Sequence, residues 1–245
     1  MKTKERLDLL KSTYNTKLFI EQDPIQFAHQ FSDLKNIEVV AFLVATITWG
    51  KRPMILKSAT KMLKMMGGSP YDFIMKEQYA SLGTQNIHRT FFEQDFVYFC
   101  KGLREIYSKQ DSIQPLFSKA PDLWQGIIDF RNNFVLANDG IDSKHISNPE
   151  KKSACKRLHM GLRWLVRDDG IVDLGVWKDI NPSALFIPLD THVARISREL
   201  GLLTRKSNDK QSVVELTEQL RLLDSNDPIG YDFALFGWGE DGGGL

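Results

Sequence analysis

Apolar residues recur at helical spacing along most of the chain, and the strict alternation that predicts strands is scarce. Residues 37–48 are almost entirely apolar, which predicts a buried core helix. Elsewhere apolar and charged residues share each segment, which predicts amphipathic helices over residues 5–14, 53–66, 94–109, 123–136, 151–167, 191–200, 212–222 and 228–238. We therefore predict an all-α protein.

Helix starts and stops are also marked in the sequence. Asp23-Pro24 and Ser69-Pro70 predict helix starts, because Asp or Ser caps free N–H groups and proline fits the first turn. Gly67-Gly68 and Gly201 predict helix ends. Residues 138–149 are polar and predict a loop, and residues 171–189 are irregular.

Composition narrows the class of protein. The chain has 245 residues, and its 42% apolar and 26% charged residues are typical of one large globular domain or two small ones. The longest apolar run, residues 39–45, is far shorter than the ~20 residues that span a bilayer. No secretory signal pattern begins the chain, so we expect a cytoplasmic protein that does not contact membranes.

The cysteine count and the net charge narrow the possible classes of protein further. Cys100 and Cys155 are too few for a disulfide framework or a four-cysteine metal site. We expect neither metal nor cofactor, because His159 and His192 have no partners at ligand spacing. The net charge is only +1, so a nucleic-acid role must depend on local clusters of charge.

The most informative segment is residues 187–202, with the sequence IPLDTHVARISRELGL. Asp190 stands where a helix begins, so its carboxylate is expected to accept N–H groups there and to stay ionised in the favourable field of the helix dipole. Taken alone, Asp190 fits an ordinary helix cap.

The order Pro188, Leu189, Asp190, Thr191, His192, Val193 and Arg195 resembles a segment of the helix-hairpin-helix (HhH-GPD) DNA glycosylase superfamily. The resemblance implies that Asp190 is the catalytic carboxylate and that a lysine nucleophile precedes it in members that also cut the strand. It also implies two helical subdomains with a cleft between them, at about residues 36–137 and at about residues 1–35 plus 150–240.

A second, weaker resemblance lies in residues 38–63, which are similar to an early helix–loop–helix of that superfamily whose loop probes the DNA stack. The corresponding residues here are Trp49, Gly50, Lys51 and Arg52. An aromatic wedge beside two cations suits minor-groove insertion and phosphate contact. A core tryptophan next to solvated cations is the alternative.

The sequence also departs from the superfamily. It lacks the glycine-rich hairpin that precedes the usual reactive lysine, and it lacks the iron–sulfur cysteine cluster of some members. Lys156 lies 34 residues before Asp190, a spacing that resembles the archaeal 8-oxoguanine glycosylase branch, in which the hairpin is remodelled. The string at residues 155–167 also resembles a bacterial family known only as a domain of unknown function.

The predicted helix at residues 151–167 supports a nucleic-acid site independently. Residues 150–167 hold six Lys or Arg and one acid. At helical spacing one face would carry Lys152, Lys156, His159, Arg163 and Arg167. Such crowded cations favour an anionic partner, for which phosphodiester backbone is the simplest candidate. A solvated surface helix is the alternative.

These patterns predict a monomeric base-excision glycosylase with lyase activity, acting on a damaged base, for example an oxidised purine, in double-stranded DNA. Lys156 would attack the sugar and Asp190 would stabilise its positive charge. The expected DNA contacts are Trp49, Gly50, Lys51, Arg52, Lys152, Arg157, His159, Arg163, Arg167, Thr191 and Arg195. The candidates for holding the flipped base are Trp164, Trp177 and Phe186, each of which also fits a core position.

Two other functions remain open at this point. The missing glycine hairpin favours a non-catalytic nucleic-acid-binding member of the same fold, because that hairpin would supply N–H groups to phosphate. The near-neutral charge favours a helical protein-interaction module.

Overall fold

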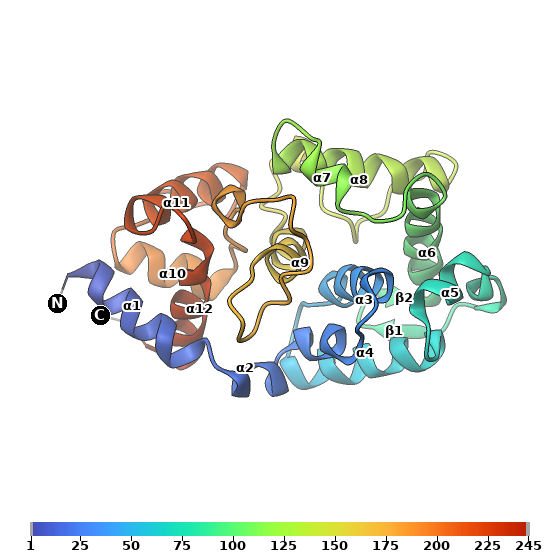
Figure 1. Ribbon diagram of the computed structural model, residues 1–245, viewed down its shortest axis with the longest axis horizontal. Helices are drawn as coiled ribbons and strands as arrows, with labels where there is room; N and C mark the ends of the chain where they lie inside the picture. The colour runs from blue at the N-terminus through green and yellow to red at the C-terminus, as the bar shows by residue number, and fades with distance from the viewer. Residues whose placement is uncertain (1, 244–245) are drawn as a thin grey trace. The chain divides into compact units, whose positions relative to one another are not determined.

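The computed structural model describes residues 2–243, and it is mostly helical (Figure 1). Twelve α-helices, several short 3-10 turns and one two-stranded hairpin make up the described chain. The hairpin pairs β1 (Asn86–His88) with β2 (Phe91–Phe92) in antiparallel orientation. The all-α prediction is therefore confirmed at the level of fold class. In the described residues, no helix is both long and apolar enough to cross a membrane.

The chain divides into two compact units. The central unit is Gln22–Ser147, and the terminal unit joins the residues up to Glu21 with those from Asn148 onward. The sequence predicts these boundaries near residue 35 and between residues 137 and 150. The first boundary lies earlier because the 3-10 helix η1 (Pro24–Gln30) packs on α3 (Leu34–Thr46).

In the central unit, α3 is buried along nearly its whole length, as its apolar run predicts. Its one buried acid, Glu38, accepts hydrogen bonds from the Tyr107 hydroxyl (2.8 Å) and the Ile113 N–H (3.1 Å). Around α3 lie the unit's other α-helices: α4 (Arg52–Met66), α5 (Pro70–Met75), α6 (Glu93–Tyr107), α7 (Pro115–Ser118) and α8 (Leu123–Ala137). Ser69 caps α5 and Gly67 ends α4, in agreement with the sequence.

In the terminal unit, α12 (Asp232–Glu240) packs against both α1 (Thr3–Tyr14) and α10 (Thr191–Glu199). The 3-10 helix η5 (Pro228–Tyr231) leads into α12 and contacts α11 (Lys210–Leu223). These contacts explain why α12 is buried although it begins with an acid. The unit's remaining long helix is α9 (Lys156–Val166).

The start of α9 differs from the prediction, which placed it at residue 151. The chain instead makes a short 3-10 turn, η3 (Pro149–Lys151), and both Lys152 and Cys155 have left-handed backbone conformations, with φ of 63° and 48°. Ser153 lies between them and pairs with Asp209 in an isolated bridge. Helix propensity in residues 151–155 is therefore overridden by tertiary contacts, and Lys156 becomes the first helical residue.

Candidate active site

Asp190 is the N-cap of α10, as predicted. Its Oδ1 accepts the Val193 N–H at 2.9 Å, and this bond fixes the carboxylate at the positive end of the helix dipole. The other oxygen, Oδ2, lies 4.0 Å from the Lys156 Nζ. The Asp190 side chain is 17% exposed, so the carboxylate serves as a cap and still has access to solvent.

Lys156 reaches Asp190 because α9 begins at this residue. The left-handed Cys155 turns the chain immediately before the helix, and the Cys155 carbonyl accepts the first helical hydrogen bond, from the His159 N–H. The Lys156 side chain is 28% exposed. Folding thus brings an accessible amine and an accessible carboxylate together from positions 34 residues apart in the chain.

A second, buried ion pair lies close to the first. Arg163, two turns after Lys156 on α9, contacts the carboxylate of Asp232 at the start of α12. Burial raises the pKa of Asp232 to about 6, and the charge of Asp190 adds to the rise, against the opposing pull of Arg163 and Lys156. The electrostatic influence of both Lys156 and Asp190 on Asp232 makes these four residues one charged cluster.

Further carboxylates extend this cluster into the core. The Arg163 Nε donates to Asp173 at 3.2 Å, and Arg167 donates to Asp173 (2.9 Å) and, through two nitrogens, to Asp227 (2.7 and 2.8 Å). Burial opposes the charge of Arg167, but the carboxylates of Asp227 and Asp173 outweigh it and raise the pKa of the guanidinium. Buried charges of opposite sign must compensate one another, so this network holds the C-terminal half of α9 in place.

The network corrects the prediction that α9 presents a cationic face to an anionic partner. Arg163 and Arg167 are only 4% and 3% exposed, and carboxylates already engage both. His159 is fully buried, and burial lowers the pKa of its imidazole to about 3, so it is neutral. These three side chains are not available to contact DNA. Lys152 is exposed but lies outside the helix.

Two of the three predicted base-pocket aromatics belong to the hydrophobic core. Trp164 and Trp177 are fully buried, so a flipped base has no access to either ring. Phe186 is half-buried, and its ring lies 5.7 Å from that of His159 and 5.2 Å from the Arg221 guanidinium carbon. Phe186 is the member of this group that keeps an exposed part.

The predicted wedge, Trp49, is half-buried in the central unit. Its ring packs edge-on to His88 and stacks on His145, with centroid distances of 4.7 and 5.5 Å. Its carbonyl is 2.8 Å from the His88 Nε2. The ring is therefore fixed within its own unit, as the alternative of a packed tryptophan describes. Gly50 and Lys51 next to it are exposed, and Arg52 is half-buried.

The remaining predicted contacts differ in their surroundings. Thr191 is exposed at the first position of α10, and Arg157 is half-buried beside Lys156. Arg195 is half-buried, and it donates to the carbonyls of Gly239 (3.0 Å) and Gly243 (2.9 Å). Because Arg195 satisfies carbonyls at the end of α12, its position has a structural explanation.

Asp232 and Asp173 were not predicted from the sequence. The signal that could have identified Asp232 is an acid at the head of an apolar run, because a charge carried into the core must find a partner. Nothing local marks Asp173, whose partners Arg167 and Arg163 lie 6 and 10 residues earlier in the chain. Among residues 2–243, no group of three or more His, Cys, Asp or Glu is arranged to hold a metal ion.

Fold and site together define a mostly helical protein in which a buried charge network adjoins an accessible Lys–Asp pair. Residues 23–241 match the family described as "Protein of unknown function (DUF2400)", and the chain belongs to this family. No curated protein and no solved structure matches the chain.

Proposed function

We propose that this protein is a base-excision DNA glycosylase with lyase activity, of the HhH-GPD type with a remodelled hairpin. The observation that carries the proposal is the 4.0 Å separation of the Lys156 Nζ and the Asp190 Oδ2. The resemblance at residues 187–202 assigns the carboxylate to Asp190, and the lysine chosen from spacing alone lies beside that carboxylate. A single sugar carbon is small enough to contact both groups.

The chemistry requires a neutral amine. In the proposed step, Lys156 gives a proton to the Asp190 carboxylate and its nitrogen lone pair bonds to C1′ of the sugar. The C1′–N bond to the base breaks and its electron pair leaves with the base. Asp190 passes the proton on to the leaving base, and the carboxylate that this restores stabilises the positive charge that remains on the sugar–amine adduct. Opening of the sugar ring gives a Schiff base, and loss of a C2′ proton then breaks the C3′–O bond and cuts the strand on the 3′ side.

The structure supports a smaller set of DNA contacts than the sequence predicts. Among the predicted contacts, Lys51 in the central unit and Lys152 and Thr191 in the terminal unit have exposed side chains that can meet a phosphate. Lys152 and Thr191 belong to the segments that lead into α9 and α10, the helices that carry the Lys–Asp pair. We propose Lys152 and Thr191 as backbone contacts of the terminal unit, and Gly50 and Lys51 as backbone contacts of the central unit.

Borohydride trapping tests the proposal. The protein is mixed with duplexes that contain an abasic site or 8-oxoguanine, reduced, and separated on denaturing gels. The proposal predicts a covalent adduct for the wild type, loss of the adduct in Lys156→Ala, and an unchanged adduct in Lys178→Ala. Lys178 is a suitable control because it is an exposed lysine of the same unit, paired with Asp168 instead of Asp190.

Duplex binding at several salt concentrations, measured beside the trapping, separates the proposal from the two alternative functions. Salt-dependent binding of the duplex without an adduct would assign a non-catalytic DNA-binding role and refute the lyase activity. Absence of both binding and adduct at low salt would favour a protein-interaction role. An adduct that persists in Lys156→Ala would show that another lysine is the nucleophile.

A further inference from the structure

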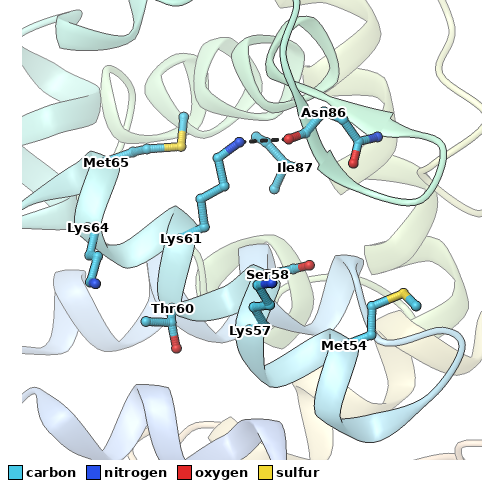
Figure 2. A pocket seen from close by; sticks show the side chains of 9 residues that line it. All are labelled: Met54, Lys57, Ser58, Thr60, Lys61, Lys64, Met65, Asn86 and Ile87. Atoms are coloured by element: carbon cyan, nitrogen blue, oxygen red, sulfur yellow. Dashed lines mark hydrogen bonds between the residues drawn. The ribbon is translucent and has the colours of Figure 1, made fainter.

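A groove in the central unit shares no residue with the Lys–Asp site. It has a volume of about 760 Å³ and runs along α4, with β1 on its other side (Figure 2). Its length, from Met54 to Met65, corresponds to about three helical turns, or ~16 Å.

The groove is cationic. Lys57, Lys61 and Lys64 line it at the i, i+4 and i+7 positions, so all three follow one side of α4. No lining residue is acidic, and the sequence from Val39 to Tyr71 contains five Lys or Arg and no Asp or Glu. The lysines therefore have no local acid to neutralise them, and the charge favours an anionic occupant.

The groove is also apolar between its lysines. Met54 is 45% exposed, Met65 is half-buried, and the buried Ile87 forms part of the lining. Methionine side chains are flexible and suit surfaces that bind amphipathic helices. No aromatic side chain lines the groove, so a single-stranded nucleic acid would lack the ring on which its bases stack.

The hydrogen bond drawn in Figure 2 limits the kind of secondary structure that a ligand in the groove can have. The Lys61 Nζ donates to the Asn86 carbonyl of β1 at 2.6 Å. This carbonyl already accepts a hydrogen bond from Lys61, and β1 is only three residues long. The edge of the hairpin therefore has few backbone groups with which a peptide could pair as an added strand. Packing of a helix along α4 uses the full length of the groove.

From these observations we propose that the α4 groove is a docking site for an acidic amphipathic helix of a partner protein. Acidic side chains of the partner, spaced one turn apart, pair with Lys57, Lys61 and Lys64. Its apolar stripe covers Met54 and Met65. The proposal does not rest on the lyase function, because none of these residues belongs to the Lys156–Asp190 site.

Fluorescence anisotropy with designed peptides tests the site. The probe is a labelled helical peptide of about three to four turns, with Glu at i, i+4 and i+7 and Leu on the adjacent stripe. The first control peptide has the same composition in scrambled order, and the second carries Lys in place of Glu. We expect saturable binding of the acidic peptide that weakens with salt, and no saturable binding of either control.

Matched variants locate the binding. The double variant Lys57→Glu with Lys64→Glu is expected to weaken the peptide about tenfold or more, because it replaces attraction with repulsion. Met54→Ser is expected to weaken it roughly fivefold through lost apolar contact. The control, Lys101→Glu with Lys144→Glu, makes the same charge change at exposed lysines of the same unit outside the groove and is expected to leave the affinity unchanged. Circular dichroism confirms that each variant is folded.

Two outcomes would overturn the proposal. The first is equal binding of acidic and scrambled peptides, or equal weakening by the groove and control variants. The second is binding of a blunt-ended DNA duplex that is lost in the groove variant while the acidic peptide does not bind, because this result assigns the surface to nucleic acid.

Discussion

The amine of Lys156 and the carboxylate of Asp190 face each other at 4.0 Å, although one opens α9 and the other caps α10. Lys156 is the first residue of α9 and Asp190 is the N-cap of α10, so the start of each helix fixes the position of its charged side chain. The Asp190 carboxylate divides its two oxygens between structure and site, with Oδ1 on the Val193 N–H and Oδ2 toward the amine. This division allows the two roles of Asp190 to be separated by mutation.

Asp190→Asn is expected to keep the fold and lose the chemistry. An asparagine side chain caps a helix about as well as aspartate, so the free energy of unfolding should change little. The amide carries no charge and cannot take the lysine proton, so trapping should fall by about a hundredfold or more. Asp190→Ala should lose the cap as well, at a cost of about 1 kcal/mol. Denaturant unfolding together with borohydride trapping measures both effects, and equal trapping by wild type and Asp190→Asn would contradict the assigned role.

Arg163→Met is expected to be strongly destabilising. The substitution leaves Asp232 buried without its guanidinium partner, while Asp173 keeps only Arg167, and breaking a buried ion pair in this way costs about 3–5 kcal/mol. Lys178→Met is the control, because its pair with Asp168 is more than half exposed on both sides and such pairs contribute about 0–1 kcal/mol. Urea unfolding followed by circular dichroism compares the two, and similar losses would show that the network does not stabilise the unit.

His159 predicts a specific dependence of stability on pH. Burial holds the pKa of its imidazole at about 3, below the usual value near 6.5, so between these values the unfolded chain binds a proton that the folded protein does not. The free energy of unfolding therefore falls as the pH falls, by about 2 kcal/mol from this residue between about pH 7 and about pH 5.

His159→Phe should remove this contribution while keeping a buried ring. The measured quantity is the difference in free energy of unfolding between wild type and variant at several pH values, because the difference cancels other groups. Asp232 makes that cancellation necessary, since its pKa of about 6 lies above the usual acid value and favours the folded state on acidification. His29→Gln, at an exposed position, serves as the control. Parallel stability curves for wild type and His159→Phe would contradict the prediction.

The sequence predicted the features that depend on local chemistry. The core helix α3, the end of α4, the start of α5 and the cap at Asp190 follow from apolar runs, glycine and capping residues close to each position. Helical periodicity also placed Arg163 on the same side of α9 as Lys156. It did not indicate that this side is buried, because the acids that neutralise Arg163 come from Asp173 and Asp232, 10 and 69 residues further along the chain.

The start of α9 was predicted wrongly for a similar reason. Lys151 and Lys152 are good helix formers, but Ser153 pairs with Asp209 and Cys155 adopts a left-handed conformation. Pairing between such distant residues is a tertiary constraint that helix propensity does not contain. The candidate site could be found because its two members carry their own signals, a motif and a lysine at a given spacing. The buried carboxylates that neutralise Arg163 were not found, because they lie far from Arg163 along the chain.

Gly50→Ala tests the loop between α3 and α4. Gly50 has a φ of 99°, which favours glycine, and an added Cβ would lie 2.6 Å from the Arg89 Nη1. We expect a loss of roughly 1–3 kcal/mol in the free energy of unfolding, because an alanine must either strain the backbone or displace Arg89. Gly68→Ala is the control, since a Cβ there meets nothing within 4 Å and its φ lies outside the left-handed region. If the loop also contacts DNA, duplex binding measured well below the melting temperature should weaken in folded Gly50→Ala and not in Gly68→Ala. Equal stability of the two variants would show that the loop tolerates a side chain at position 50.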